Sequence, residues 1–364
     1  MADQGNGGRP FRSFRVFDFP KTLVGDPFSP KHGAFFGNEN PSNQYILVKI
    51  RFRQNKVNMQ DSQVFQKIQE RALRTKTVFG GSNDCYRLVD RDVAEVVVER
   101  YGPCLWVSWF REAAPTEGDL SWIGQLAQEA GCDHWLVNGM VDRGKDPGLE
   151  KRWQSPEFPG RWQSKENSIT FNLRVDTGLS PGLFLDQRAN RKLLRNLSRN
   201  TKVLNLFAYT CSFSVVAALG GATQVTSVDV SQPFLDWGKE NFTSNGLPTE
   251  GHYFVKADTR DYLTLARKRG WLFNYIILDP PSFSRSKGNT FAVKKELVPM
   301  AKNCLDLLVP GGEVLVSTNL STWSPDDLRS ELKAGLRCQV RPGECEGDIT
   351  DKVNSAKTFW LKRS

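Results

Sequence analysis

Long apolar segments are missing from this sequence. No run approaches the roughly 18 consecutive apolar residues that a membrane-spanning helix needs. The first residues, MADQGNGGR, are polar and glycine-rich and lack the apolar centre of a signal peptide. No internal repeat or low-complexity tract occurs either. We therefore expect a protein that folds in water, makes no membrane contact and resides in the cytoplasm.

Paired cysteines and clustered histidines are also absent. The 364 residues include 7 scattered cysteines and only 3 histidines, and no CxxC pair occurs. This pattern supports neither a disulfide framework nor a zinc site, so we expect reduced thiols and no bound metal.

Length and charge indicate the number of domains, the class of protein and the kind of partner. A chain of 364 residues is too long for one ordinary core, which predicts more than one domain. Its 24% charged and 39% hydrophobic residues are typical of globular proteins. The formal net charge of +9 favours an anionic partner, with nucleic acid as the first candidate.

Three regions differ in pattern. Residues 1–60 contain one strand-like run, YILVKIRFR, and are otherwise unassigned and expected to be partly disordered. Residues 61–175 combine helical and strand patterns, including a hairpin around an Arg-Tyr-Gly-Pro turn, and predict a mixed α/β module. In residues 176–364 apolar strands alternate with helices. That alternation predicts a parallel sheet covered on both faces, the doubly wound Rossmann-like α/β class.

Five strands of this sheet are predicted, at KVLNLF (202–207), QVTSVDV (224–230), HYFVKA (252–257), FNYIILD (273–279) and EVLVSTN (313–319). Ligands of such sheets bind beyond the carboxyl ends of the strands. Asp229 ends the second strand and can accept hydrogen bonds from both ribose hydroxyls, and Asp258 after the third can meet an adenine edge. Each could instead only cap the following helix.

The first strand is not followed by a GxGxxG string, which is the pyrophosphate cradle of dinucleotide-binding proteins. A NAD-linked oxidoreductase is therefore a distant alternative. S-adenosylmethionine fits better, because this cofactor has adenine, ribose and a sulfonium but no pyrophosphate.

Four segments carry a resemblance to a known family: GLFLDQRANRKLL, LNLFAYTCSFSVVAALGGA, SVDVSQPFLDWGKENFTSNGL and LDPPSFSRSK. They resemble class I S-adenosylmethionine-dependent methyltransferases that modify large-subunit ribosomal RNA. This family includes the guanine-N7 methyltransferase domain of a bacterial bifunctional enzyme and a related cytosine-C5 methyltransferase. The resemblance is dense over residues 174–320, weaker over 62–110, and fades before residue 60.

The resemblance implies the contacts of the cofactor. It implies that the methionine end lies on Asn205, Phe207, Tyr209 and Thr210, the ribose on Asp229 and the adenine near Asp258, that Gln187 and Arg188 close the crevice, and that Asp279 borders it. Cys211 departs from the family, which usually has glycine there. Its Cβ in a tight turn either is harmless or weakens cofactor binding, and we expect it to be harmless.

The turn Asp279-Pro280-Pro281-Ser282-Phe283 is expected to hold the target base. Its prolines stiffen the backbone, Phe283 offers a ring for stacking, and Asp279 can accept a hydrogen bond from the base. The alternative is a structural turn with Phe283 in the core.

Our prediction of the methylated atom depends on the lack of a cysteine just past the fifth strand. A cytosine-C5 enzyme attacks its base with a cysteine thiolate, which in the relatives of that chemistry sits just past the fifth strand. Residues 317–321 here are Ser-Thr-Asn-Leu-Ser. Guanine N7 needs only alignment of its lone pair with the methyl group, and Asn319 either helps to hold the base or is an ordinary turn residue. We therefore predict guanine N7. The alternatives are cytosine C5 and a non-catalytic RNA-binding protein that keeps the fold.

The clearest basic segment is DQRANRKLLRNLSRNTK, residues 186–202. Its cations recur at intervals of three or four residues, which places them on one helix face with the leucines opposite: Arg188, Arg191, Lys192, Arg195 and Arg199. This face either contacts RNA phosphates or is simply solvated. Arg285 and Lys287 are expected to extend it, and residues 61–175 to help grip RNA. The predicted partner is ribosomal RNA or a large-subunit assembly particle.

Overall fold

The computed structural model describes residues 69–71, 73, 83–91, 95–140, 152–176, 180–281, 283–286, 289–351 and 355–363. The chain divides into two compact units, residues 1–54 and 55–364, and every described residue belongs to the second unit. The expectations for residues 1–60, including the strand at 45–53, thus lie outside the described residues.

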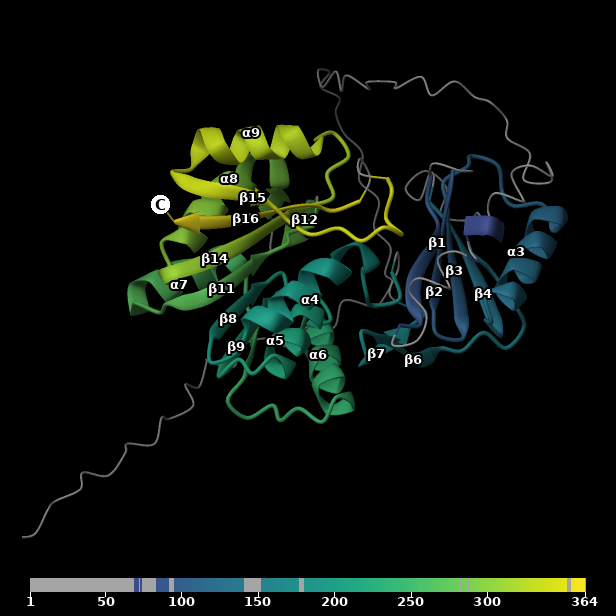
Figure 1. Ribbon diagram of the computed structural model, residues 1–364, viewed down its shortest axis with the longest axis horizontal. Helices are drawn as coiled ribbons and strands as arrows, with labels where there is room; N and C mark the ends of the chain where they lie inside the picture. Colours follow the sequence, from purple (N-terminus) through teal and green to yellow (C-terminus); the bar gives the residue numbers. More distant parts are fainter. Residues whose placement is uncertain are drawn as a thin grey trace, which may run out of the picture. The chain divides into compact units, whose positions relative to one another are not determined.

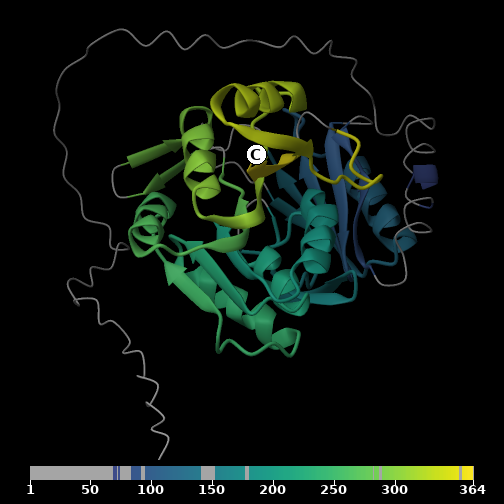
Figure 2. The same cartoon turned by 60° about the vertical axis from the view of Figure 1, so that its left-hand side comes forward.

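The first sheet of this unit has the strand order β1-β2-β3-β4-β5. Its strands are β1 (Cys85–Val89), β2 (Val96–Tyr101), β3 (Cys104–Trp109), β4 (His134–Gly139) and β5 (Arg152–Gln154). Helix α3 (Glu117–Glu129) links the parallel strands β3 and β4 and begins at a capping box of Thr116 and Asp119. These strands and α3 are blue in Figure 2. The hairpin predicted around Gly102 is confirmed as β2 and β3.

A separate two-stranded ribbon follows, made of β6 (Arg161–Glu166) and β7 (Ile169–Arg174). Asn167 and Ser168 form its turn with φ of 51° and 64°. Two left-handed residues are the signature of the tight hairpin turn whose twist matches that of the strands, and asparagine tolerates this conformation well.

The large sheet has the order β10-β9-β8-β11-β14-β16-β15. Its strands are β8 (Lys202–Leu206), β9 (Gln224–Asp229), β10 (Tyr253–Lys256), β11 (Phe273–Leu278), β14 (Leu308–Thr318), β15 (Cys338–Pro342) and β16 (Lys357–Arg363). Strand β16 is antiparallel to both of its neighbours, and the other pairs are parallel. The strand order reverses between β8 and β11, which is where a doubly wound sheet opens a crevice.

Helices cover both faces of this sheet. They are α4 (Arg188–Leu197), α5 (Ser212–Leu219), α6 (Gln232–Ser244), α7 (Thr259–Arg269), α8 (Val293–Leu305) and α9 (Pro325–Gly335), with a short 3₁₀ helix η1 (Leu185–Gln187) before α4. In Figure 1, α8 and α9 lie on one side of the sheet and α4, α5 and α6 on the other. Alternate residues of one strand serve opposite cores: Ile276 and Leu278 pack with α7–α9, and Ile277 with α4 and α5.

All five predicted strands are present, and the doubly wound class is confirmed. Within residues 176–364, four further strands were not predicted: β15, β16 and the ribbon of β12 (Phe283–Ser286) and β13 (Asn289–Ala292). The domain boundary at residues 175–176 stays a prediction. One buried cluster crosses it, because Tyr101 and Trp106 of the first sheet pack in the same core as Val203 and Trp360 of the large sheet.

All seven cysteines are free thiols. Among the described residues, no helix has the length and apolar character required to cross a bilayer. The same residues contain no grouping of three or more His, Cys, Asp or Glu side chains arranged for a metal ion.

Candidate active site

The turn after β8 has an unusual backbone. Phe207, Tyr209 and Cys211 all adopt the left-handed region, with φ of 55°, 48° and 61°. L-residues rarely adopt this region, and strain of this kind gathers at functional sites, at roughly 1–3 kcal/mol each. The turn is held by two main-chain bonds, from Ala208 N to Val228 O at 3.0 Å and from Cys211 N to Ala208 O at 2.8 Å. It ends where α5 begins, at Ser212.

Cys211 directs its side chain into the protein. Its thiol is buried beside Ala208 and Leu235, and burial raises the pKa of this thiol to about 12. Gly238 of α6 provides the space, because a Cβ at that position would come within 2.4 Å of Cys211 Sγ. The left-handed φ explains why glycine is usual here. The inward packing supports our expectation that the cysteine is harmless.

Asp229 lies at the end of β9 and is half-buried. Its carboxylate accepts two backbone N–H groups at 2.9 Å, from Tyr209 to Oδ2 and from Ser231 to Oδ1. Desolvation raises its pKa although both hydrogen bonds act against the shift. A carboxylate has about four acceptor positions, so acceptor capacity remains for a ribose hydroxyl.

Two other residues of the implied cofactor set are buried beside this turn. The Thr210 hydroxyl donates to Gly182 O at 2.6 Å and ties the turn to the segment before η1. Asn205 donates through Nδ2 to Ser214 Oγ of α5 at 2.9 Å. Both side chains are therefore engaged within the protein, where they hold the turn in place.

Asp258 follows β10 and caps α7. Its carboxylate accepts from Arg260 N at 2.9 Å and pairs with the Arg260 guanidinium at 2.8 Å. These hydrogen bonds lower the pKa of Asp258. The capping interpretation is thus confirmed for this residue, and an adenine contact stays a prediction.

Asp279 follows β11 on the far side of the strand-order reversal. Gln187 of η1 donates through Nε2 to Ser317 Oγ at 2.7 Å and to Asp279 Oδ2 at 3.4 Å. Desolvation raises the pKa of Asp279 to about 6, against the opposing hydrogen bond from Ser317. The structure therefore brings Gln187, Asp279 and Ser317 together as a hydrogen-bonded group at the crevice.

The residues expected to hold the base are only partly placed. Pro280 is buried, Pro281 is exposed, and Asn319 is exposed directly after β14. Because β11 and β14 are parallel neighbours, Asp279 and Asn319 lie at the same edge of the sheet. Phe283 and Arg285 belong to β12, but their side chains lie outside the described residues, as does Lys287.

Two residues of the crevice were not predicted. Ser317 was considered only as the place of a missing thiol. Phe184 is 48% exposed, and its ring centroid lies 5.7 Å from that of Tyr209. Its carbonyl accepts from Arg191 Nη2 at 2.8 Å. The only signal for Phe184 was its position within GLFLDQR, since exposure of an aromatic ring depends on the surrounding fold.

The prediction that Arg188 belongs to an exposed cationic face of α4 is wrong, whereas its place in closing the crevice stays a prediction. The Arg188 guanidinium is fully buried between three partners. It pairs with Asp348, pairs through Nε with Glu346 at 2.7 Å, and donates to Cys85 O at 3.0 Å. It therefore joins β1 and the segment after β15 to α4.

Arg191 is the second correction. It is 1% exposed and pairs with Glu166 of β6 through Nε at 2.7 Å and Nη2 at 2.6 Å. A buried, neutralised guanidinium is not presented to an RNA phosphate, so the predicted role of Arg191 in RNA binding is wrong. Lys192 and Arg199 are exposed and Arg195 is half-buried, and none of the three has a side-chain partner within the described part of the chain.

Comparison with known proteins agrees with this geometry. Residues 76–337 match the S-adenosylmethionine-dependent methyltransferase family. The chain is 38% identical over 265 residues to the ribosomal RNA large subunit methyltransferase K of Neisseria meningitidis, covering 69% of this chain and 73% of that protein. It is 35% identical over 283 residues to the K/L methyltransferase of Pseudoalteromonas atlantica, covering 75% of this chain. It spans only 38% of that longer relative.

Solved structures show the same fold. SMU.776, crystallised in complex with S-adenosylhomocysteine (SAH), superposes with a TM-score of 0.72 at 26% identity, covering 82% of this chain and 81% of SMU.776. An S-adenosylmethionine-dependent methyltransferase from Agrobacterium tumefaciens gives a TM-score of 0.61 at 24% identity, covering 78% of this chain and 91% of that one.

The fold and the crevice define an enzyme of the class I methyltransferase type. The chain belongs to the S-adenosylmethionine-dependent methyltransferase family, and S-adenosylmethionine is its cofactor. The residues of the crevice fit that cofactor. Asp229 keeps acceptor capacity that suits a ribose, and the carboxylate of Asp279 has the charge that suits a cationic sulfonium.

Proposed function

We propose that this chain transfers a methyl group from S-adenosylmethionine to a base of large-subunit ribosomal RNA, with guanine N7 as the acceptor atom. The proposal draws on the names of the relatives and on the crevice. One relative carries the name of a large-subunit ribosomal RNA methyltransferase, and this chain spans 73% of it.

We choose guanine N7 over cytosine C5 because the described residues of the crevice include no reactive cysteine thiol. Ser317 stands at the end of β14, buried and hydrogen-bonded to Gln187. Cys211 and Cys304 are both buried, and burial raises the pKa of each thiol well above its usual value. A cytosine-C5 mechanism needs a thiolate in contact with the base. Guanine N7 needs no thiolate, because its lone pair lies in the ring plane, carries no proton and can take the methyl group directly.

The catalytic work we assign to the protein is binding and alignment. The bound cofactor supplies an activated methyl group on its sulfonium. Asp229 holds the ribose, and the stiff Asp279-Pro280-Pro281 turn places the base, with Phe283 as a stacking surface and Asn319 as a polar contact. Phe184 and Tyr209 add an aromatic border to the crevice.

RNA recognition in this proposal uses Lys192, Arg195 and Arg199, which have no side-chain partner among the described residues, together with Arg285, Lys287 and the module of residues 61–175. The substrate is either naked ribosomal RNA or a large-subunit assembly particle. Such a substrate implies action in the cytoplasm.

The test uses ribosomal RNA from a strain lacking this gene. Purified protein and isotopically labelled S-adenosylmethionine are added, and the labelled nucleosides are identified by mass spectrometry after digestion. We expect label in 7-methylguanosine. Label in 5-methylcytidine would mean that a cysteine reaches the base after all. Absence of both label and cofactor binding would leave the non-catalytic RNA-binding protein as the better description.

A further inference from the structure

A small pocket lies between α4, α5 and the β6–β7 ribbon, and nothing in the proposed chemistry uses it. Its volume is about 160 Å³. Pockets that enclose whole small-molecule ligands occupy about 300–1,000 Å³. A pocket of this size suits one part of a larger ligand.

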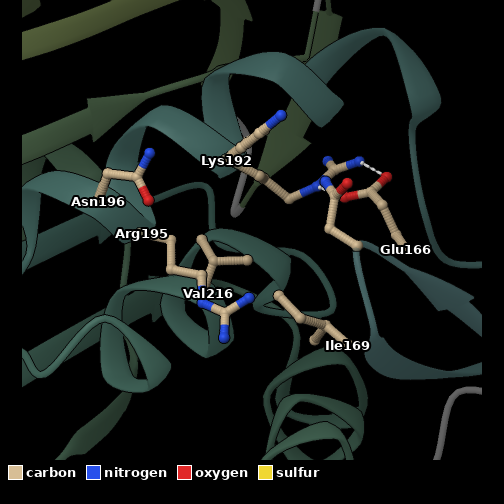
Figure 3. Close-up of a pocket in the computed structure, with 8 residues that line it drawn as sticks. Glu166, Ile169, Lys192, Arg195, Asn196 and Val216 are labelled. Atoms are coloured by element: carbon tan, nitrogen blue, oxygen red, sulfur yellow. Dashed lines mark hydrogen bonds and ion pairs between the residues drawn. The ribbon is translucent and has the colours of Figure 1, made fainter. Parts of the chain in front are cut away.

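The floor of the pocket is apolar and electrically neutral. Ile169 of β7 and Val216 of α5 are both buried there. The Arg191–Glu166 pair closes one side, and because each partner is buried and neutralised by the other, the pair adds no net charge. Figure 3 shows Glu166 with this ion pair at one end and the Arg195 guanidinium beside Val216.

The rim carries the net charge. Lys192 and Arg195 line the pocket from successive turns of α4, and neither side chain has a partner among the described residues. Two unpaired cations above a neutral apolar floor offer a site for a group that is anionic at one end and flat and apolar at the other. A nucleotide has this chemistry, since its phosphate is charged and its base has two apolar faces.

The pocket is also connected to the crevice. The guanidinium of Arg191, which pairs with Glu166 in the pocket wall, donates from Nη2 to the carbonyl of Phe184 at 2.8 Å. Gln187, which contacts Asp279, lies one turn of helix before Arg191. The wall of the pocket and the crevice are therefore joined through helix α4 and the segment before it.

We propose that this pocket binds one unpaired nucleotide of the RNA substrate, outside the target base, with its phosphate on Lys192 and Arg195 and its base against Ile169 and Val216. The proposal rests on the proposed function and deepens it. Arg195 and Lys192 are positioning residues, since they hold the strand rather than touch the reacting atoms.

The experiment measures binding of a fluorescein-labelled single-stranded RNA oligonucleotide of mixed sequence at several salt concentrations. Four variants are compared with the native protein: Lys192→Gln, Arg195→Gln, Arg195→Lys and Arg329→Gln. The last removes an exposed charge from α9, where no pocket is present among the described residues, and serves as the matched control. Methylation of ribosomal RNA and affinity for SAH are measured alongside.

We expect Arg195→Gln to weaken RNA binding on the order of tenfold and Lys192→Gln less. The slope of log affinity against log salt should fall by about 0.7 for each lost phosphate contact on a single strand. Arg195→Lys should keep the native slope because it keeps the charge. Affinity for SAH and the behaviour of Arg329→Gln should be unchanged.

The outcomes separate the two proposals. If native protein methylates ribosomal RNA while Arg195→Gln and Lys192→Gln keep the native affinity and slope, the pocket proposal is overturned alone. If native protein binds the oligonucleotide through Arg195 but methylates no ribosomal RNA, the proposed function is overturned alone. Equal losses in Arg195→Gln and Arg329→Gln would mean that only overall charge matters, and would overturn the pocket.

Discussion

Cys211 and Gly238 are sterically complementary across the cofactor turn. A glycine at 211 would relieve the left-handed strain, whereas the cysteine fills the space that Gly238 leaves open. The turn was recognisable in the sequence, but its partner on α6 was not, because the contact depends on how α6 packs.

We expect Gly238→Ala to destabilise the protein by about 1–3 kcal/mol, because the new Cβ would overlap Cys211 Sγ. Urea unfolding gives this difference. In the double variant Cys211→Gly/Gly238→Ala the overlap is gone, so the two costs should fail to add. Simple additivity in this double-mutant cycle would show that the contact between the two side chains is not the cause.

Asp229 offers a test of the cofactor site. Asp229→Ala removes the acceptors for Tyr209 N and Ser231 N as well as those left for the ribose, so we expect weaker binding of SAH in calorimetry. Asp229→Asn retains one oxygen acceptor and should lose less. Native affinity in both variants would contradict the assignment of Asp229 to the ribose.

Asp279 should make cofactor binding depend on pH. Its pKa of about 6 in the folded protein means that the carboxylate is charged above pH 6 and neutral below it. Affinity for the cationic S-adenosylmethionine should therefore fall as pH falls through about 6. Affinity for SAH, which has no sulfonium charge, should change much less.

The control for that titration is Asp279→Asn, in which the two pH profiles should coincide. Parallel profiles in the native protein would contradict the proposed contact with the sulfonium. The same raised pKa has a consequence for stability. Since the folded state binds this proton more tightly, the contribution of Asp279 to stability is full at low pH and is lost as pH rises through about 6.

At the scale of elements, α4 shows where sequence patterns fail. Spacing alone placed five cations on one solvated face, yet Arg188 and Arg191 are buried. Their partners Asp348 and Glu166 come from distant parts of the chain. Helical periodicity places residues on a common face but does not tell which buried acid meets them, so the cationic surface is smaller than predicted.

The buried pair of Arg188 and Asp348 gives a prediction for this element. Asp348 also accepts from Arg87 N at 2.9 Å, so it joins β1 to α4. Asp348→Ala should cost about 3–5 kcal/mol of unfolding free energy, because it leaves a buried guanidinium short of its partner. The matched control is Asp306→Ala, which breaks the exposed pair with Arg267 and should cost less than about 1 kcal/mol. Equal costs in denaturant unfolding would contradict the structural role of Asp348.

For the whole molecule, the five parallel strands of the large sheet were predictable because each contains a short apolar run between helical segments. Strands β15 and β16 were not, because β16 pairs antiparallel with β14 and β15 joins the sheet only through β16, and neither contact is visible in their own sequence pattern. The cofactor was predictable from strand-end acids and a missing glycine cradle. The network of Gln187 and Ser317 was not, since these residues are far apart in sequence.

The continuous core across residue 175 predicts how the second unit unfolds. Tyr101 donates to Leu183 O at 2.9 Å and packs in the same cluster as Trp360. We expect the first sheet and the large sheet to unfold in a single thermal transition. A concentration of SAH 100 times its dissociation constant should stabilise the whole transition by about 2.7 kcal/mol. Two transitions in calorimetry, with only one moved by SAH, would contradict this.

The position of β16 in the sheet affects the order in which this protein can fold during its synthesis. It lies between β14 and β15 in the sheet, but it is the last of the described strands to be synthesised. Until residues 357–363 leave the ribosome, β14 and β15 have no strand between them, and the core around Trp360 stays open. A growing chain can fold its earlier elements first. The large sheet of this enzyme is therefore complete only after residues 357–363 have been synthesised and have paired with both β14 and β15.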